Sequence, residues 1–234
     1  MMLNQFESIK KTANGYYICG DHADVKLIFM SDDVIRIRVS FDKKFKEASY
    51  ALVTCAWEDE LDTLFEKERK KIKALKVPYK ETDNQIIFTT KKVKLVLRKK
   101  PFSFQLYDLE GNVIYQDLKE RAFDCDHLGR VTHYSVVDRE HDHFYGFGEK
   151  TGHLDKMGRR MRMSPKDAIG HDPEFGEPLY KSIPFYIRIN DQQRKAVGLF
   201  YNNSHDAIFD MCNEISGYWD IATIRQRVVI LICF

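Results

Sequence analysis

Apolar and polar residues alternate along several short segments of the chain, most regularly around Ile37. Ile35, Ile37 and Val39 are separated by Arg36 and Arg38. Successive side chains of a strand point to opposite faces, so a period of two is typical of a strand that is buried on one side. The segment is therefore predicted to be a strand with an apolar face in the core and its arginines in water.

The same alternation recurs at intervals through the rest of the chain. It is found in residues 93–97, 102–106, 113–115, 185–189 and 197–201. The turn-forming sequence DLEGN joins the second of these segments to the third, which predicts a hairpin. Many short strands joined by polar turns favour a mainly β, antiparallel sandwich over a fold of alternating strands and helices.

One segment, residues 59–76, departs from this pattern. Its apolar residues Leu61, Leu64, Phe65, Ile72 and Leu75 lie close to a period of 3.6, with acids early and lysines late. That order of charge suits the helix dipole, so the segment is predicted to form the one short helix of the fold. Asp59 is then expected to be its N-cap or first-turn acid.

The C-terminal residues 228–234 are apolar and rich in β-branched side chains. They are predicted either to fill a strand position in the sandwich or to form an adhesive tail. The chain shows no internal repeat and no low-complexity linker, which indicates a single domain over residues 1–234.

The composition excludes several functional classes. Lys plus Arg number 37 against 35 for Asp plus Glu, a net charge of +2, which argues against a dedicated nucleic-acid-binding protein. The five cysteines are odd in number and include no CxxC pair, which argues against a disulfide scaffold or a zinc site. The N-terminus does not resemble a signal peptide, and no window approaches the ~20 apolar residues of a membrane helix. A soluble, cytoplasmic protein without a membrane partner is expected.

The most unusual segment is residues 144–189, whose glycines, aromatics and charges follow neither a helix nor a strand period. Gly146, Gly148 and Gly152 lie within seven residues, so the backbone there can adopt positive φ or allow another segment to approach closely. A cationic run is followed by an acidic, proline-containing run. So many polar groups in a short segment are typical of a shaped loop that meets solvent, a ligand or another domain.

This segment carries five elements in a fixed order: YGFGEKTG, GRR, KDA, HDP and YKSIPF, with VGLFYNNSHDAIFDM after them. Their order and spacing resemble the N-terminal domain of glycoside hydrolase family 31, the α-glucosidase and α-xylosidase family. Any one element alone is a weak signal, whereas five in order are specific. The resemblance implies a galactose mutarotase-like β-sandwich that acts on an α-glucoside or α-xyloside together with a catalytic barrel.

The resemblance also implies that the catalytic residues lie elsewhere. Members of this family cleave α-glycosides with retention, using two carboxylates from a (β/α)₈ barrel held about 5 to 5.5 Å apart. Such a barrel needs about 250 residues of its own, and the family's nucleophile pattern is absent, its nearest lookalike being Trp57-Glu58-Asp59-Glu60. The chain looks truncated before the barrel, so no catalytic residue, cofactor or metal is predicted and hydrolysis by this chain alone is not expected.

One substrate-binding residue, Asp167, is carried over from the family. An aspartate at the matching position of relatives hydrogen-bonds hydroxyls of the leaving-group sugar, a task that suits a carboxylate because it accepts strong bonds from two hydroxyls at once. The alternative is that Asp167 caps a turn with Lys166 or Ala168. Ser164 and Pro165 stand where relatives carry other residues, which leaves the neighbouring contacts open.

Other charged residues nearby have structural explanations. Glu149 and Lys150 could be a catalytic pair, but a carboxylate beside glycines more often ties down a loop through backbone N–H groups. Arg159, Arg160 and Arg162 could clamp an anionic sugar, but are predicted instead to pair with nearby acids. Those acids are Asp155, Asp172, Glu174 and Glu177. His141 and His143 could share a face as a metal pair, but no third ligand has suitable spacing.

Three functions remain in competition. The leading one is the non-catalytic N-terminal domain of a retaining α-glucosidase-type enzyme, which contributes a loop to the aglycone side of the active site. The alternatives are a free-standing carbohydrate-binding module, which needs an aromatic platform, and a mutarotase-like enzyme, which needs an acid and a base at the anomeric centre. Glycone specificity and assembly into a homo-oligomer are left open.

Overall fold

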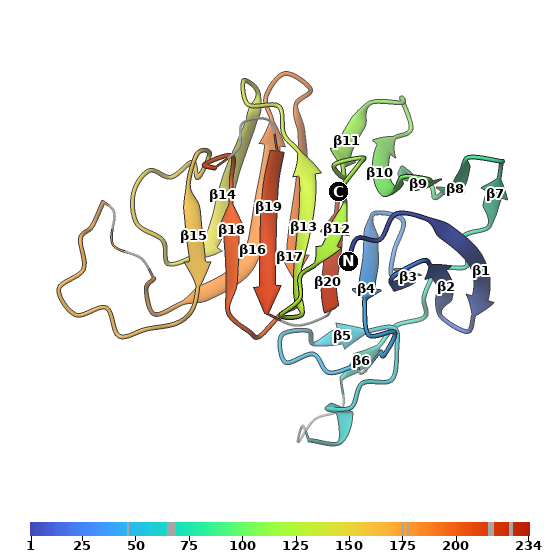
Figure 1. The fold of residues 1–234 in the computed structure, drawn as a ribbon, viewed down its shortest axis with the longest axis horizontal. Helices are drawn as coiled ribbons and strands as arrows, with labels where there is room; N and C mark the ends of the chain where they lie inside the picture. Colours follow the sequence, from blue (N-terminus) through green and yellow to red (C-terminus); the bar gives the residue numbers. More distant parts are fainter. Residues whose placement is uncertain (46, 65–68, 175, 177, 215–217, 225–226) are drawn as a thin grey trace.

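The protein is described by a computed structural model of residues 1–45, 47–64, 69–174, 176, 178–214, 218–224 and 227–234. Three antiparallel sheets make up most of it, and a two-stranded parallel ribbon of β5 (Thr54–Cys55) and β6 (Lys70–Lys71) lies beside them (Figure 1). The described helical structure is a single turn of 3₁₀-helix, η1 (Asp62–Leu64). The mainly β, sandwich-like fold expected from the alternating segments is confirmed.

The largest sheet has eight strands in the order β1-β2-β3-β4-β20-β17-β16-β14. Their bounds, in that order, are Phe6–Thr12, Gly15–Gly20, Asp24–Phe29, Val34–Ser40, Arg227–Cys233, Lys195–Tyr201, Ser182–Asn190 and Asp142–Gly148. The C-terminal strand β20 pairs with β4 on one side and with β17 on the other. Of the two outcomes predicted for residues 228–234, the strand position is the one observed.

Two five-stranded sheets complete the sandwich. The first has the order β11-β10-β9-β8-β7, with bounds Val113–Gln116, Phe102–Asp108, Val93–Lys99, Gln85–Thr89 and Tyr79–Glu81. The second has the order β12-β13-β19-β18-β15, with bounds Phe123–Cys125, Arg130–Val136, Tyr218–Ile224, Ala207–Asp210 and Arg160–Met163. The alternating segments at 93–97, 102–106 and 113–115 are β9, β10 and β11, and 102–106 pairs with 113–115 as the DLEGN turn predicts.

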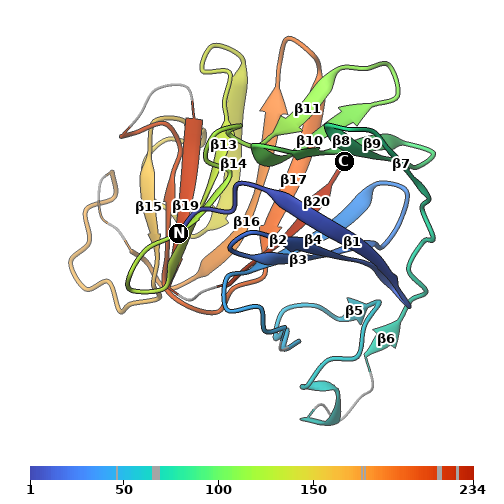
Figure 2. The ribbon, with the colours of Figure 1, turned by 45° about the vertical axis from the view of Figure 1, so that its right-hand side comes forward.

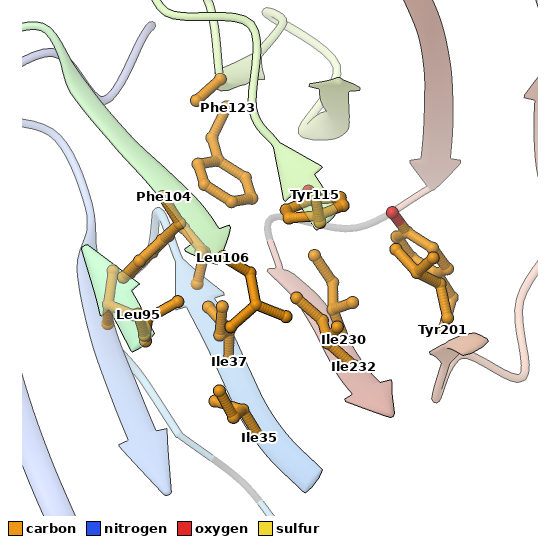
Figure 3. Packing of buried hydrophobic residues seen from close by; sticks show 14 of the residues in the cluster. Ile35, Ile37, Leu95, Phe104, Leu106, Tyr115, Phe123, Tyr201, Ile230 and Ile232 are labelled. Carbon is orange, nitrogen blue, oxygen red and sulfur yellow. The ribbon is translucent and has the colours of Figure 1, made fainter. Parts of the chain in front are cut away.

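A single apolar cluster connects all three sheets. Figure 3 shows Ile37 of β4 and Ile230 and Ile232 of β20 close to Leu106 of β10, with Tyr115 above them and Tyr201 to one side. The cluster continues to Phe123 in β12 and Phe209 in β18. Because every sheet buries one face in this cluster, the large sheet serves as the common base on which the two smaller sheets rest.

A buried polar network lies within this apolar core. The ring nitrogens of His133 lie 2.8 Å from the Tyr201 hydroxyl and 2.9 Å from a carboxylate oxygen of Asp117. Tyr115 donates its hydroxyl to the same oxygen of Asp117, and the other oxygen accepts the backbone N–H of Phe104. Burial raises the pKa of Tyr115 and of Tyr201 well above the usual range. A fully bonded network of this kind fixes the relative position of the sheets that supply it.

The arginines of β4 are not in water, contrary to the sequence prediction. Arg36 and Arg38 are 2 % and 4 % exposed. They lie on the face of the sheet opposite the core. The segment that carries β5 and β6 covers this face, as Figure 2 shows, and Trp57 packs there against Ile28 of β3. Glu47 accepts a hydrogen bond from Arg36 and forms an ion pair with Arg38, so the charges are paired rather than solvated. The alternation predicted the strand correctly, but it did not predict that another segment of the protein covers the outer face of this strand.

The helix predicted over residues 59–76 is wrong in the described residues of that range. Instead of an N-cap, Asp59 is a buried carboxylate that accepts the N–H groups of Ser49 and Leu61 and lies 3.2 Å from Arg69. Lys70–Lys71 forms the strand β6. Leu64 is 74 % exposed, so the apolar positions with helical spacing do not share one face. Tertiary ion pairs outweigh a weak helix propensity here.

A substitution in β20 tests whether this strand holds the eight-stranded sheet together. Ile232→Ala removes a fully buried side chain at the seam between β4 and β17, so the free energy of unfolding should fall by about 2 to 5 kcal/mol. Ile169→Ala makes the same chemical change at a position that is 88 % exposed, and its effect should stay within about 0.5 kcal/mol. Urea unfolding followed by fluorescence measures both, and equal losses would contradict the assignment.

Candidate functional site

The described residues of the loop between β15 and β16, which are 164–174, 176 and 178–181, project from the end of the sandwich and are called the arm below. In both ribbon views it extends beyond the sheets (Figures 1 and 2). Asp167 lies in its first part, and Tyr180 lies at its end. The arm is therefore placed to contact something outside the sandwich.

Asp167 is exposed on the arm and does not pack against its own sandwich. The Tyr180 hydroxyl donates a hydrogen bond of 2.8 Å to Oδ1 of Asp167. Within the described part of the chain, Oδ2 of Asp167 accepts no hydrogen bond. The carboxylate is thus oriented through one oxygen while the other faces solvent. Tyr180 begins the YKSIPF motif, but its role as the orienting partner is not predictable from the sequence, because only the fold brings the two ends of the arm together.

Both ends of the arm are held by two consecutive residues, Glu149 and Lys150. The Glu149 carboxylate accepts the backbone N–H of Lys181 at 3.2 Å and lies 3.3 Å from Nζ of the same residue. Lys150 donates from Nζ to the carbonyl oxygen of Arg162, 3.0 Å away. Their predicted role as a loop tie, rather than a catalytic pair, agrees with these contacts. We call Glu149 and Lys150 the clamp.

The clamp is positioned by a glycine-rich bulge at the end of β14. Gly146, Phe147 and Gly148 all have positive φ, at 129°, 70° and 81°, and the strand register shifts between the two glycines. A Cβ at Gly148 would lie 2.4 Å from the carbonyl oxygen of Lys181, so a side chain there would push the arm away. Phe147 is fully buried and stacks on Tyr186 at 4.9 Å, which anchors the bulge in the core. Positive φ and close approach, both predicted for these glycines, are observed.

The middle of the arm rests on the segment that follows the clamp. Thr151 donates its hydroxyl to the carbonyl of Gly176, and the N–H of Gly152 is 3.3 Å from the carbonyl of Pro173. Arg159 reaches the carbonyl of Glu174 at 3.4 Å. The arm is therefore supported along its length by backbone acceptors, which explains why a sequence with so many charges can hold a fixed shape.

Two of the arginines have partners other than those expected. Arg162 pairs with Asp206 at 2.8 Å, and Arg160 lies 3.2 Å from Glu214. Arg162 is the main cause of a lowered pKa at Asp206. The prediction that these residues tie loops together is right, whereas the acids named for them were wrong. Strand β15 pairs with β18, so its arginines meet acids in the segments on either side of β18. The expected acid Glu177 lies outside the described residues.

His143 stands between two carboxylates at the base of β14. Its Nδ1 is 2.7 Å from Asp155, and its Nε2 is 3.5 Å from Asp191, which also contacts His141. The hydrogen bond with Asp155 raises the pKa of His143 above its ordinary value; partial burial opposes this rise, and Asp191 adds to it. Asp155 also accepts hydrogen bonds from the N–H groups of Phe144 and Met157, so it links β14 to the segment between the clamp and β15.

No group of three side chains among the described residues could hold a metal ion. The part of the chain that the structure describes also contains no helix long and apolar enough to cross a membrane.

Comparison with known proteins gives the family. Residues 24–210 match the model of the glycosyl hydrolase 31 N-terminal galactose mutarotase-like domain. The chain belongs to this family. The match begins at Asp24, so it includes the strands of the first half from β3 onward as well as the motif-bearing segment.

Two α-glucosidases are similar in sequence to the family 31 domain. α-Glucosidase 2 of Bacillus thermoamyloliquefaciens is 33 % identical over 200 residues, which cover 85 % of this chain and 23 % of that relative. The α-glucosidase of Saccharolobus solfataricus is 39 % identical over 70 residues, or 30 % of this chain and 10 % of the relative. The chain thus spans about a quarter or less of the length of these relatives.

The fold recurs in solved structures of the same family. A family 31 dextranase of Flavobacterium johnsoniae, complexed with isomaltotriose, superposes with a TM-score of 0.83 at 23 % identity, over 100 % of this chain and 26 % of that one. At this level of identity the similarity establishes the fold of the family 31 domain and nothing further about its ligands.

The histidine between two carboxylates predicts a pH-dependent contribution to stability. The pKa of His143 is raised on folding, so its contribution is complete below the unfolded value of about 6.5 and disappears as pH rises through the folded value. The stability difference between wild type and His143→Gln should therefore be larger at pH 5.5 than at pH 8.5. Thermal unfolding at both values measures it, and an equal difference at both would contradict the assignment.

Removal of the clamp should loosen the arm without unfolding the sandwich. Glu149→Ala deletes the acceptor for the Lys181 N–H, so amide hydrogen exchange within residues 164–181 should accelerate severalfold while the unfolding temperature changes little. Glu120→Ala, at an exposed position in another loop, serves as the matched control and should leave exchange in the arm unchanged. Unaltered exchange in the Glu149→Ala arm would show that the clamp does not hold it.

Proposed function

We propose that this chain is the non-catalytic N-terminal domain of a retaining α-glucosidase-type enzyme and that its arm completes the aglycone side of an active site supplied by a catalytic barrel. The domain family and the fold are established above, and the contribution to the substrate is the proposal. The observation that supports it most directly is the exposed Asp167 carboxylate, which is oriented by Tyr180 and held away from the sandwich.

The chemistry of the arm suits a leaving-group sugar. A carboxylate oxygen without an internal partner accepts hydrogen bonds from sugar hydroxyls, and charged acceptors form the stronger bonds. Orientation by Tyr180 lowers the entropy lost on binding, because the carboxylate is already restricted before a sugar arrives. The backbone contacts of Glu149 and Lys150 at the base of the arm also restrict it before a sugar binds, and so lower the entropy lost on binding.

The substrates of the relatives support an α-glucoside as the first choice. The curated relatives are α-glucosidases, and the dextranase was solved with isomaltotriose. We infer that the sugar contacted by Asp167 belongs to an α-linked glucoside, and the glycone itself is recognised by residues outside this chain.

The thiols of the five cysteines, three of them buried, support a reducing compartment such as the cytoplasm.

A chimera tests the role of Asp167 in an active enzyme. The matching N-terminal segment of the Bacillus α-glucosidase 2 is replaced by this chain, and the activity of the chimera on maltose sets the baseline. Asp167→Asn should then lower kcat/KM by about 10- to 100-fold, the loss expected for one or two bonds to a charged acceptor. Glu174→Gln, another acid on the same arm, should leave kcat/KM within about twofold, a change too small to represent a lost bond.

The isolated chain provides the control for the alternatives. It should not release p-nitrophenol from an aryl α-glucoside, and calorimetry with maltose or isomaltose should show no saturable binding. Clear binding would favour a free-standing carbohydrate-binding module, and anomerisation of glucose above the buffer rate would favour a mutarotase-like enzyme. An Asp167→Asn chimera as active as its parent would contradict the role of the arm.

A further inference from the structure

The strand β16 is more apolar on the outer face of the eight-stranded sheet than on the face that enters the core. Its inward residues include Tyr186, Arg188 and Asn190, and the last two bind the carboxylate of Asp142 in β14. Its outward residues are Ile183, Phe185, Ile187 and Ile189. The alternation of residues 185–189 therefore predicts the strand correctly, but the apolar row of that strand lies outside the core.

These side chains form one apolar strip with their neighbours in β14 and β17. Tyr145 of β14 lies opposite Ile187, and Phe200 of β17 lies opposite Phe185. The ring of Phe185 extends across β17, because a Cβ at Gly198 would lie 3.1 Å from this ring. We call the following set the outer strip: Tyr145, Ile183, Phe185, Ile187, Ile189 and Phe200.

The outer strip is open among the residues that the structure describes. Ile183 and Ile187 are 50 % and 38 % exposed, and the side chains of the outer strip belong to neither apolar cluster of the described residues. The other half of the same face is closed, because Trp57 packs against Ile28 of β3 and stacks on Arg36 of β4. One half of the outer face thus carries its own cover, whereas the described chain leaves the half formed by β14, β16 and β17 without one.

Charged groups border the outer strip at both ends. At one end His143 lies opposite Ile189 and between two carboxylates. At the other end Ile183 follows Lys181, which pairs with Glu149 of the clamp at 3.3 Å. An exposed apolar patch with a polar rim is typical of a surface that binds another protein or domain.

The outer strip begins where the arm ends. The arm closes at Lys181, and β16 begins at Ser182. The side chain of Ile183 lies 3.2 Å from the position of a Cβ at Gly148, in the bulge that positions the clamp. Asp167 is joined to this end of the arm by Tyr180. A body that receives Asp167 therefore comes next to the outer strip.

We propose that the outer strip is the surface on which the catalytic barrel docks, with helices from the outside of the barrel as its cover. This inference rests on the proposed function, because that function places a barrel beside the arm. A (β/α)₈ barrel is enclosed by a ring of helices, and helices packed on a sheet face are a common way to bury it. The matched part is 23 % of the Bacillus α-glucosidase 2 and 26 % of the dextranase, so a larger body accompanies it in both relatives.

Thiol labelling tests whether a barrel covers the outer strip. Ile187→Cys is introduced into the isolated chain and into the chimera with the Bacillus enzyme, and mass spectrometry follows residue 187 separately from the five native cysteines. Labelling at residue 187 should be about tenfold slower or more in the chimera, because a covered thiol is not reached by the reagent. Val113→Cys, at a strand position of another sheet that is 37 % exposed, should react at the same rate in both proteins. Equal rates at residue 187 in the two proteins would overturn the proposal.

The concentration dependence of labelling distinguishes the barrel from a second copy of the chain. If the barrel is the partner, the rate at residue 187 in the isolated chain should be the same in dilute and in concentrated samples. Protection that grows with concentration would show that a second copy covers the outer strip, and would overturn the proposal. This measurement needs no chimera.

Ile187→Asp gives a second measurement, since it places a charge in the middle of the proposed interface. In the isolated chain it should lower the unfolding temperature no more than Val113→Asp does, because both positions are similarly exposed there. In the chimera Ile187→Asp should lower the unfolding temperature by several degrees more than Val113→Asp, because only residue 187 is then buried against the barrel. Equal shifts for the two variants in the chimera would contradict the docking surface.

The Asp167→Asn chimera separates a failure of this inference from a failure of the proposed function. If only the role of the arm is wrong, kcat/KM is unchanged by Asp167→Asn while residue 187 is still protected from labelling in the chimera. If only the docking surface is wrong, Asp167→Asn lowers kcat/KM while residue 187 reacts equally fast in the chimera and in the isolated chain.

Discussion

The burial of β20 between β4 and β17 is the constraint on which the rest of the fold depends. The N-terminal strands β1 to β4 and the motif-bearing strands β14, β16 and β17 belong to one sheet only because β20 bonds to both groups. Its side chains Ile230 and Ile232 enter the core that the two smaller sheets also share. The hydrophobic effect acts on that shared core, so the sheets hold one another in place.

The position of the arm is set by these sheets. The clamp residues follow the bulge that ends β14, and β14 pairs with β16, which begins where the arm ends. Phe147 holds the bulge because its ring is buried against Tyr186 and Phe209. A positive φ at a residue other than glycine is unfavourable. Phe147 keeps it because the surrounding core accommodates its ring in this position. The packing of Phe147 in the core therefore also sets the orientation of the arm.

The sequence allowed the strands to be predicted wherever one face of a strand enters the core, because alternation is a local consequence of that burial. It did not allow the surroundings of Arg36 and Arg38 to be predicted, since their cover is supplied by residues distant in the chain. The helix expected around Leu61 failed for a related reason, because its acids and bases serve tertiary ion pairs such as that of Asp59 with Arg69. Asp167 was found only through the family resemblance, and its partner Tyr180 only through the fold.

The two mispredicted segments belong to one physical arrangement. A strand that carries arginines on its outer face must either remain in water or receive a cover that brings its own carboxylate, and the segment that follows β4 brings Glu47. Burial by itself raises the pKa of Glu47, but the charges of Arg36 and Arg38 outweigh it and keep that pKa below its ordinary value. Buried ion pairs contribute little net stability compared with apolar packing. The role of Glu47 is therefore to make the cover compatible with two buried arginines, because removal of its carboxylate would leave their charges unpaired.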